Sequence, residues 1–350
     1  MIERLLIRLS LFSAPLVLLL VAVNYFGDGG RIIRGEDSHK IEEILLSGTY
    51  CTNLSNFNDA NFQQRYVAQL EGKYKTVVLG SSRALLLGNL LIPDSSLYNT
   101  SFTSASLEDV LGMYQYYTEH HPVPQKILLS IDPWMFNDEF AKEGFGEFHS
   151  AFLESQGIEV PGANNQKRNR SVLRVLFSLS YFQESVKEIP ALIRGKRGPY
   201  ATQEPYNEEM TILPDGSRTY PASYQNLSSL RKRITIESYM NGRSHLEGFR
   251  EVSPSRWDYF SHFVMQAMDK GIAVELLLFP YHPYAYEFVE ADHPMVMQVE
   301  EKILVWAKEQ QVPVHGSFDP EVLGMDDQAF FDAVHNNRFG VQTVLQHQAN

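Results

Sequence analysis

The sequence is poor in cysteine and in basic residues. Its 350 residues include a single cysteine, Cys51, so a disulfide within the chain is excluded, as are zinc and iron–sulfur sites built from several cysteines. Only 30 Lys and Arg residues stand against 42 Asp and Glu residues, which gives a formal net charge of −12. An acidic chain without a basic run is a poor match to non-specific nucleic-acid binding.

Signatures of bound cofactors are missing as well. The turn at residues 80–83 lacks the glycines of a G-x-G-x-x-G dinucleotide loop, and no glycine-rich loop there is followed by a lysine. We therefore expect no nucleotide cofactor and no metal. The remaining composition, 44% hydrophobic and 21% charged, is typical of a globular protein with one large domain or two ordinary ones.

One long apolar run is present, at residues 9–26. Its roughly 18 residues are near the lower limit for a helix that crosses a bilayer. Arg4 and Arg8 precede the run, so the positive-inside rule places the rest of the chain outside the cytoplasm. Because no clear small-x-small cleavage site follows, we favour a signal anchor at residues 1–27 over a cleaved signal peptide. The globular part would then be periplasmic or at the cell surface.

The body of the chain alternates between strand and helix patterns. Short runs rich in Val, Ile and Leu predict strands at Lys75–Leu79, Lys126–Ile131, Ile272–Phe279 and Val312–Val314. Helical spacing follows at Ser82–Leu87, Leu107–His120, Trp257–Lys270 and Met295–Gln310. This order predicts an α/β fold with a mostly parallel sheet and helices on both of its faces.

The domain boundaries follow from the same patterns. We expect the α/β domain at residues 72–345, preceded by a stalk and lead-in segment at residues 28–71. A stretch at about residues 138–255 fits the alternation poorly, because it is rich in loops and prolines, and we interpret it as an insertion or lid. Within it, residues 172–189 predict a helix that Pro190 closes.

Ser82 is the first residue that points to chemistry. It follows a predicted strand, and function gathers at the carboxyl ends of parallel strands. At the start of a helix its hydroxyl would be exposed, and the free backbone N–H groups and the helix dipole could hold an oxyanion. Taken alone, a serine at this place is more often a helix N-cap, and a phosphate could also bind there. A nucleophilic Ser82 needs a base elsewhere in the chain.

Asp332 and His335 near the C-terminus supply that base. Three residues apart on a helical or turn-like segment, the carboxylate can contact one ring nitrogen while the other reaches outward. A serine nucleophile requires such a pair. An isolated Asp-x-x-His can also be a surface pair, but the order Ser82, Asp332, His335 favours a catalytic triad.

These segments together resemble the SGNH (GDSL-like) hydrolase superfamily. Residues 80–82 resemble its first block, with Ser82 as nucleophile, and Asp332-Ala-Val-His335 resembles its last block, with His335 as base and Asp332 as orienter. Residues 98–106 (YNTSFTSAS) are similar to a segment of its membrane-anchored branch, which includes the lipoteichoic-acid D-alanylation protein D and the alginate O-acetylation proteins. The resemblance implies a flavodoxin-like three-layer fold.

The resemblance also implies an oxyanion site. Ser104 stands where the family has a glycine, and it still offers a backbone N–H. Asp132 stands where the family has an asparagine donor, and an ionised aspartate only accepts hydrogen bonds. We therefore expect a substitute donor, with Arg83, Asn99 and Asn137 as candidates, while Asp132 can equally end its strand in a turn.

The implied activity is that of an extracytoplasmic serine esterase or O-acyltransferase. Its ligand would be an acylated cell-envelope glycan or an acyl donor, and a membrane-bound O-acyltransferase would be its partner. A hypothesis from another class is a non-catalytic scaffold of the same fold that binds polysaccharide or that partner, which the departure at Asp132 leaves open.

Overall fold

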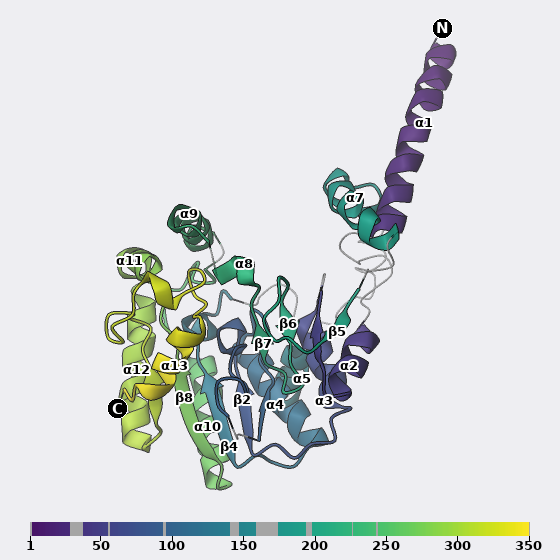
Figure 1. Ribbon diagram of the computed structural model, residues 1–350. Coiled ribbons are helices and arrows are strands. Elements are labelled where there is room, and N and C mark those ends of the chain that lie inside the picture. Colours follow the sequence, from purple (N-terminus) through teal and green to yellow (C-terminus); the bar gives the residue numbers. More distant parts are fainter. Residues whose placement is uncertain are drawn as a thin grey trace.

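The computed structural model describes most of the chain. The described residues are 2–28, 38–54, 57–93, 96–140, 147–158, 174–193, 198–225, 227–242 and 244–349. They form an α/β fold with one five-stranded parallel sheet and one four-stranded antiparallel sheet (Figure 1). The expected α/β fold with a parallel sheet is therefore confirmed.

The parallel sheet has the order β3-β2-β4-β8-β9. Its strands are β2 (Thr76–Leu79), β3 (Leu97–Asn99), β4 (Lys126–Ser130), β8 (Ala273–Leu278) and β9 (Val314–Gly316). If these five strands are renumbered 1 to 5 in chain order, the sheet has the doubly wound order 2-1-3-4-5. In sheets of this order, ligands bind beyond the carboxyl ends of strands 1 and 3, which are β2 and β4 here. Residues that follow β2 and β4 therefore meet at one edge of the sheet.

Two of these strands differ from the sequence prediction. β3 was not predicted, because three residues are too few to show a periodicity. β9 begins two residues later than expected, since Pro313 has no N–H to donate to the ladder and only its carbonyl pairs, with the N–H of Leu276 at 2.9 Å.

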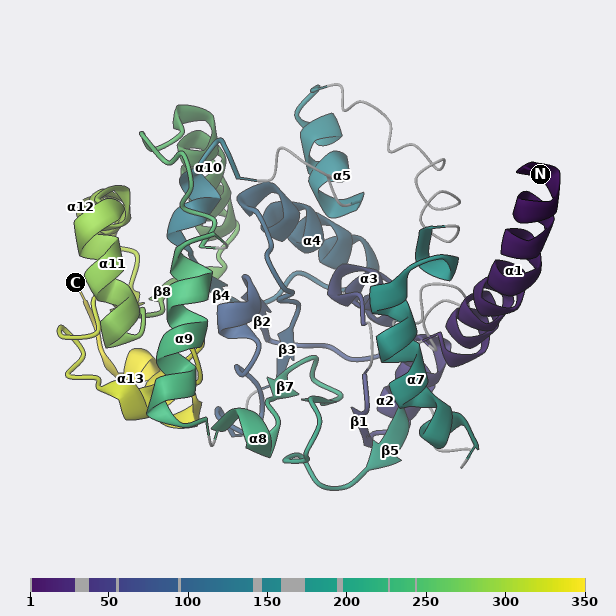
Figure 2. The same ribbon diagram turned by 90° about the horizontal axis from the view of Figure 1, so that it is seen from above.

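Alternate strand residues fill two separate cores. Val77 and Leu79 belong to the larger core, whereas Val78 between them belongs to the smaller one. Buried residues of α3 (Asp59–Val67), α4 (Leu107–His120), α10 (Pro254–Asp269) and α12 (Met295–Gln310) complete the larger core, and α13 (Arg338–Gln346) contributes to the smaller one (Figure 2). The sheet is thus covered on both faces, as the alternating pattern predicts.

The segment before the sheet is not a separate stalk. Phe62 and Tyr66 of α3 are fully buried in the larger core. β1 (Tyr50–Thr52) pairs with strands from the insertion in a sheet of order β5-β1-β6-β7, which includes β5 (Tyr200–Thr202), β6 (Thr211–Ile212) and β7 (Arg218–Thr219). The stalk predicted at residues 28–71 is therefore wrong for the described residues 38–54 and 57–71, because their apolar side chains pack into the domain. Residues 29–37 lie outside the described residues.

The remaining helices lie mostly in or near the insertion. They are α2 (Ser38–Leu46), α5 (Glu147–Ser155), α7 (Leu179–Ile193), α8 (Ala222–Gln225), α9 (Ser229–Met240) and α11 (Pro283–Asp292). Pro190 was expected to end α7, but it lies inside that helix. Proline removes one backbone donor, and the helix keeps its form for three more residues.

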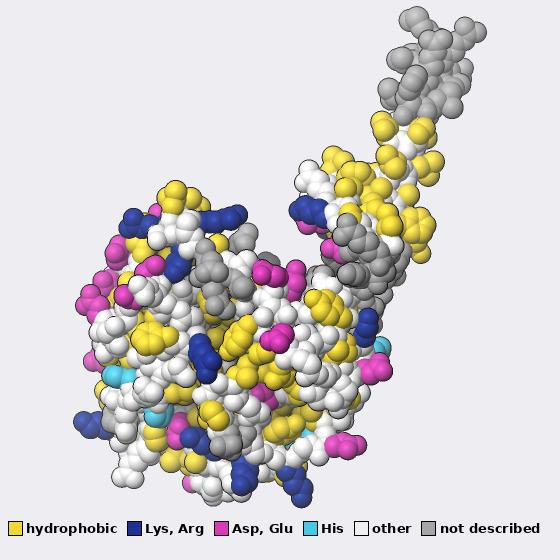
Figure 3. All heavy atoms as spheres, in the orientation of Figure 1, with side chains coloured by type: hydrophobic (Ala, Val, Ile, Leu, Met, Phe, Trp, Pro, Cys, Tyr) yellow, Lys and Arg dark blue, Asp and Glu magenta, His cyan; other side chains and the backbone are white. Residues whose placement is uncertain are grey.

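The N-terminal segment forms α1 (Ile2–Gly27), with Pro15 inside it. Near its end, the buried amide of Asn24 donates to the carbonyls of Val175 and Ser178, both at 3.0 Å, and so joins α1 to the start of α7. Among the described residues, no helix has the length and apolar character to span a bilayer. The anchor expected at residues 1–27 thus has no support from the structure. Figure 3 shows apolar side chains gathered over α7 and the described side chains of α1. Leu16 of α1 and Leu179 of α7 are both exposed.

Candidate active site

A tight turn after β2 presents Ser82. Gly80 is needed there, because a side-chain Cβ at this residue would lie 2.6 Å from the Cβ of Ser130 on the neighbouring strand. Ser82–Ala84 forms a single 3₁₀ turn instead of the helix predicted over residues 82–87. A turn this short has no helix dipole of the kind we expected, so its possible contribution to an oxyanion site is limited to backbone N–H groups.

Ser82, His335 and Asp332 are in contact, although 250 residues separate the serine from the other two. The Ser82 hydroxyl donates to Nε2 of His335 over 2.9 Å. On the other side of the ring, Nδ1–H of His335 donates to Asp332, at 2.8 Å from Oδ2 and 3.0 Å from Oδ1. This is the arrangement in which an imidazole can take the serine proton while a carboxylate holds its tautomer.

Four donors surround the Asp332 carboxylate. Besides the His335 ring, the backbone N–H groups of Val334 and His335 donate to Oδ1, and the Tyr224 hydroxyl donates to Oδ2 over 2.9 Å. Burial disfavours the ionised form, but the neighbouring His335 and these hydrogen bonds outweigh it and hold the pKa of Asp332 well below its usual range. Asp332 is therefore an anion at neutral pH. Tyr224 comes from the insertion, and no sequence motif pointed to it.

Three anchors hold the loop that carries the base. The N–H of Phe331 donates to the carbonyl of His335 and closes the loop at 2.8 Å. The Arg83 side chain donates through Nε to the Val334 carbonyl at 3.1 Å, and the N–H of His282 donates to the Ala333 carbonyl at 2.9 Å. The Asp-x-x-His segment is therefore turn-like, which was one of the two predicted forms.

Arg83 and Asp132 lie beneath the site and do not line the pocket. Arg83 is buried, with Nη1 3.4 Å from Asp132 Oδ1, Nη2 donating to the Pro280 carbonyl, and its guanidinium 4.4 Å from the Tyr281 ring centre. Burial raises the pKa of Asp132, an effect that Arg83 opposes. Arg83 does not fit the predicted oxyanion role, because its guanidinium donors are directed at protein acceptors. Asp132 does not fit it either, because its side chain is fully buried and does not line the pocket.

The two asparagines that we considered as donors are also used elsewhere. Asn99 is fully buried, and its amide donates to the carbonyls of Ala84 at 2.7 Å and Leu87 at 2.8 Å, which holds the turn after Ser82. The amide of Asn137 donates to the carbonyls of His245 and Glu247. Both positions support the site without lining it.

Two backbone N–H groups are the remaining candidates for oxyanion donors. Ser82 and Ser104 both line the pocket, and neither backbone N–H has a hydrogen-bond partner among the described residues. Ser104 has φ +55°, in the region that glycine adopts most readily, and the SGNH resemblance places a glycine at this position. Two unpaired N–H groups beside a nucleophile are the arrangement that stabilises a tetrahedral oxyanion.

A cavity of about 410 Å³ lies over the serine and has two different walls. We call the first the sheet wall, made by Ser82, Thr103, Ser104, Trp134, Val334 and His335. We call the second the insertion wall, made by Tyr239, Gly242, His245 and Glu247. The residues of the insertion wall were missed in the sequence, because they follow no periodic pattern and belong to no motif.

A larger cavity of about 800 Å³ lies beside the triad. Tyr220 and Phe331 line it with their rings 4.9 Å apart, and the Tyr220 ring also lies 5.7 Å from that of His335. Since neither Ser82 nor His335 lines this cavity, it is separate from the pocket that holds the reacting groups.

Comparisons with known proteins do not place the chain. Among the described residues, no group of three or more His, Cys, Asp and Glu could hold a metal ion. No protein-family model matches the sequence, and no curated protein is significantly similar to it. The SGNH resemblance therefore stays a prediction, and the geometry of the site is what supports a function.

Proposed function

We propose that the protein is a serine esterase or O-acyltransferase of the SGNH type. One observation carries the proposal: Ser82 Oγ lies 2.9 Å from His335 Nε2, whose ring also contacts the ionised Asp332. The same pocket is lined by Ser82 and Ser104, whose backbone N–H groups have no partner in the described part of the chain. Nucleophile, base, orienting group and oxyanion donors are the parts that acyl transfer requires.

The chemistry would proceed in two stages. As Ser82 Oγ bonds to the acyl carbon, its proton passes to His335 Nε2, and the carbonyl oxygen becomes an oxyanion held by the N–H groups of Ser82 and Ser104. The ester C–O bond then breaks, and the leaving alcohol takes the proton from His335. In the second stage, water or another hydroxyl gives its proton to His335 and attacks the acyl carbon. The bond between that carbon and Ser82 Oγ then breaks, and Ser82 Oγ takes the proton back from His335.

The substrate we propose is an acyl ester of a cell-envelope glycan, with a membrane-bound O-acyltransferase as partner. The apolar run at residues 9–26 and the exposed apolar side chains of α1 and α7 support a location at a membrane, with the site on its extracytoplasmic side. A pocket of about 410 Å³ suits a short acyl group with one sugar unit better than a long lipid chain.

The test is turnover of p-nitrophenyl acetate by the purified full chain in mild detergent. Ser82→Ala should abolish turnover and labelling by a fluorophosphonate probe, whereas Ser229→Ala, on the exposed surface of α9, should change neither. Equal rates for the wild type and Ser82→Ala would reject Ser82 as the nucleophile, whereas a wild type with neither turnover nor labelling would favour the non-catalytic scaffold.

A further inference from the structure

The loop that carries Ser104 is held on both sides by side chains of the insertion. Arg218 supports the loop before Ser104, and His149 supports it after Ser104. We propose that both are positioning residues that fix the backbone N–H of Ser104 where the oxyanion forms. The inference rests on the proposed function and deepens it, because it makes the rate of the acyl chemistry depend on the insertion.

Ser104 needs this support because its backbone is strained. Its φ of +55° lies in the left-handed region, which is unfavourable for a residue with a Cβ. A residue keeps such a conformation only where the surrounding structure holds it there. The side chain of Ser104 makes one long contact, 3.4 Å from its Oγ to His245 Nε2. The contacts of the residues before and after Ser104 therefore decide where its N–H points.

The support before Ser104 runs through Asp59, the first residue of α3. Asp59 Oδ2 accepts from the backbone N–H of Thr103 at 2.9 Å and also from the Thr103 hydroxyl. Asp59 Oδ1 lies 3.0 Å from Nη1 of Arg218 on β7. The Arg218 side chain is buried, and its Nε and Nη2 have no hydrogen-bond partner among the described residues. Its main polar contact is thus the one with Asp59.

Arg218 also contacts the turn that presents the nucleophile. Its backbone N–H donates to the carbonyl of Leu85, in the turn after Ser82, at 2.7 Å. Its guanidinium lies 5.0 Å from the centre of the Phe57 ring. One residue of the insertion is therefore joined to both the nucleophile turn and the loop of Ser104. Because the bond to Leu85 uses the backbone, a substitution of the side chain removes only the support of the loop.

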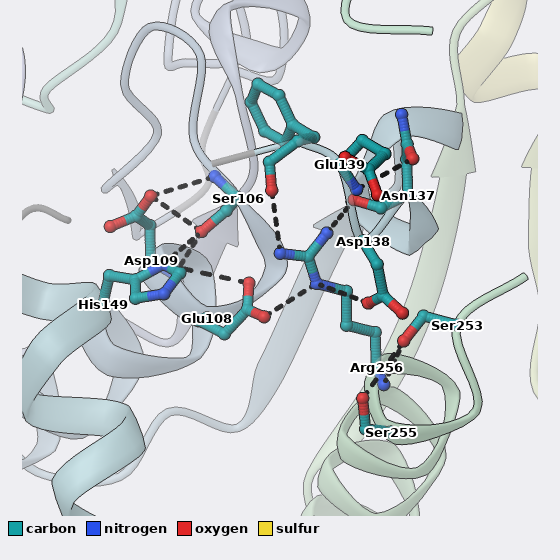
Figure 4. Close-up of polar contacts among 11 residues, drawn as sticks. Ser106, Glu108, Asp109, Asn137, Asp138, Glu139, His149, Ser253, Ser255 and Arg256 are labelled. Carbon is teal, nitrogen blue, oxygen red and sulfur yellow. Dashed lines mark hydrogen bonds and ion pairs between the residues drawn. The ribbon is translucent and has the colours of Figure 1, made fainter. Parts of the chain in front are cut away.

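The support after Ser104 is at Ser106, the N-cap of α4 (Figure 4). The Ser106 hydroxyl donates to Asp109 Oδ2 at 2.8 Å, and the N–H of Asp109 donates back to Ser106 Oγ at 3.1 Å. Since the hydroxyl proton goes to Asp109, the ring of His149 supplies the proton of the third contact, 3.0 Å from its Nδ1 to Ser106 Oγ. Burial lowers the pKa of His149, so the ring is neutral near pH 7.

Helix α5 holds His149 in this place. A Cβ at Gly112 of α4 would lie 2.1 Å from the carbonyl oxygen of Phe148, so α4 and α5 pack closely beside the histidine. Glu108 Oε2 lies 3.9 Å from Nδ1 of His149, and Glu108 Oε1 accepts from Nε of Arg256 at 2.8 Å (Figure 4). His149 is therefore buried in a network that joins α4, α5 and α10, and it is held before any substrate binds.

The experiment separates positioning from a general loss of stability. The readout is kcat and KM for p-nitrophenyl acetate, measured with the full chain in mild detergent. For Arg218→Met and for His149→Leu we expect kcat to fall at least about tenfold. Complete loss of one oxyanion donor costs about 10²–10³-fold in kcat, and a displaced donor keeps part of that effect. KM should change less than about threefold, because the oxyanion is absent from the ground state.

Conservative variants and a matched control sharpen the test. Arg218→Lys keeps a cation beside Asp59, and His149→Asn keeps an N–H donor near the place of the ring nitrogen, so each should recover part of kcat. Arg65→Met is the control, because Arg65 also lies on α3 and pairs with the buried Glu42 at 2.6 Å. It should lower the unfolding temperature and leave kcat close to that of the wild type.

Three results would overturn the inference. They are a kcat of Arg218→Met and His149→Leu within about threefold of the wild type, a rise in KM at unchanged kcat, and a loss of kcat in Arg65→Met as large as in these variants. Thermal unfolding identifies a variant that is not folded at the assay temperature, and the variant on the other side of Ser104 then decides. A wild type without Ser82-dependent turnover would instead reject the proposed function, and this inference with it.

Discussion

The two walls of the pocket are built in different ways. Ser82, Ser104 and His335 of the sheet wall follow parallel strands or a loop pinned to them, and buried polar groups such as Arg83 lie beneath. The insertion wall comes from the end of α9 and the loop after it, which are joined to the domain by the Asn137 amide and by the buried side chains of Met240 and Leu246. Proteins commonly place reacting groups on rigid elements and vary specificity through loops. Under the proposed function, the sheet wall would carry the reacting groups, and the insertion wall would shape the space that the substrate enters.

The largest effect should come from the nucleophile of the sheet wall. Ser82→Ala removes the atom that forms the acyl bond, so we expect kcat for p-nitrophenyl acetate to fall by at least about 10³-fold. Unfolding temperature should stay close to that of the wild type. If Ser82→Ala retains more turnover than this and is not labelled by a fluorophosphonate probe, the nucleophile is a residue other than Ser82.

Asp332→Asn should reduce kcat by roughly 10²–10⁴-fold, because an amide no longer stabilises the imidazolium and can favour the wrong tautomer. Tyr224→Phe removes one donor to the same carboxylate and should cost less, about tenfold or below. Steady-state kinetics on both variants would test this order. A larger loss in Tyr224→Phe than in Asp332→Asn would contradict the assigned roles.

Arg83→Met tests what supports the sheet wall. It would leave Asp132 buried without its cationic partner and free the Val334 carbonyl, so the free energy of unfolding should fall by about 3–5 kcal/mol. Urea unfolding measures this change. The double variant Arg83→Met with Asp132→Asn should recover part of the loss, and equal stability of the single and double variants would show that the pair is not coupled.

Asn137→Ala tests the insertion wall. Loss of two hydrogen bonds to main-chain carbonyls should lower the free energy of unfolding by about 1–2 kcal/mol. KM for p-nitrophenyl acetate should rise, whereas kcat for its hydrolysis should change little, because the wall lines the pocket without holding the reacting groups. An opposite result, with kcat lowered and KM unchanged, would mean that the two walls are not functionally separate.

Glu275 on β8 provides a control, because its substitution should have a smaller and pH-dependent effect on the free energy of unfolding. Hydrogen bonds from His315 and Lys126 lower its pKa to about 2, against the opposing effect of burial. A depressed folded-state pKa adds stability above the unfolded pKa, and this stability is lost as pH falls toward 2. Glu275→Gln should therefore lose about 1 kcal/mol at pH 7 and show a shallower decline between pH 4.5 and 2 in urea unfolding. A steeper decline would contradict the sign.

Sequence patterns predicted β2, β4 and β8 of the parallel sheet, the helices α4, α10 and α12, and the three residues of the proposed triad, because buried strands, amphipathic helices and short motifs are local signals. β3 and the insertion wall had no such signal, since a three-residue strand shows no period and loop residues such as His245 follow none. Only the tertiary structure decided that Arg83 forms an ion pair with Asp132 and that the Tyr224 hydroxyl donates to Asp332. The physical reason is that a side chain's partners depend on which distant segments the packed sheet brings beside it.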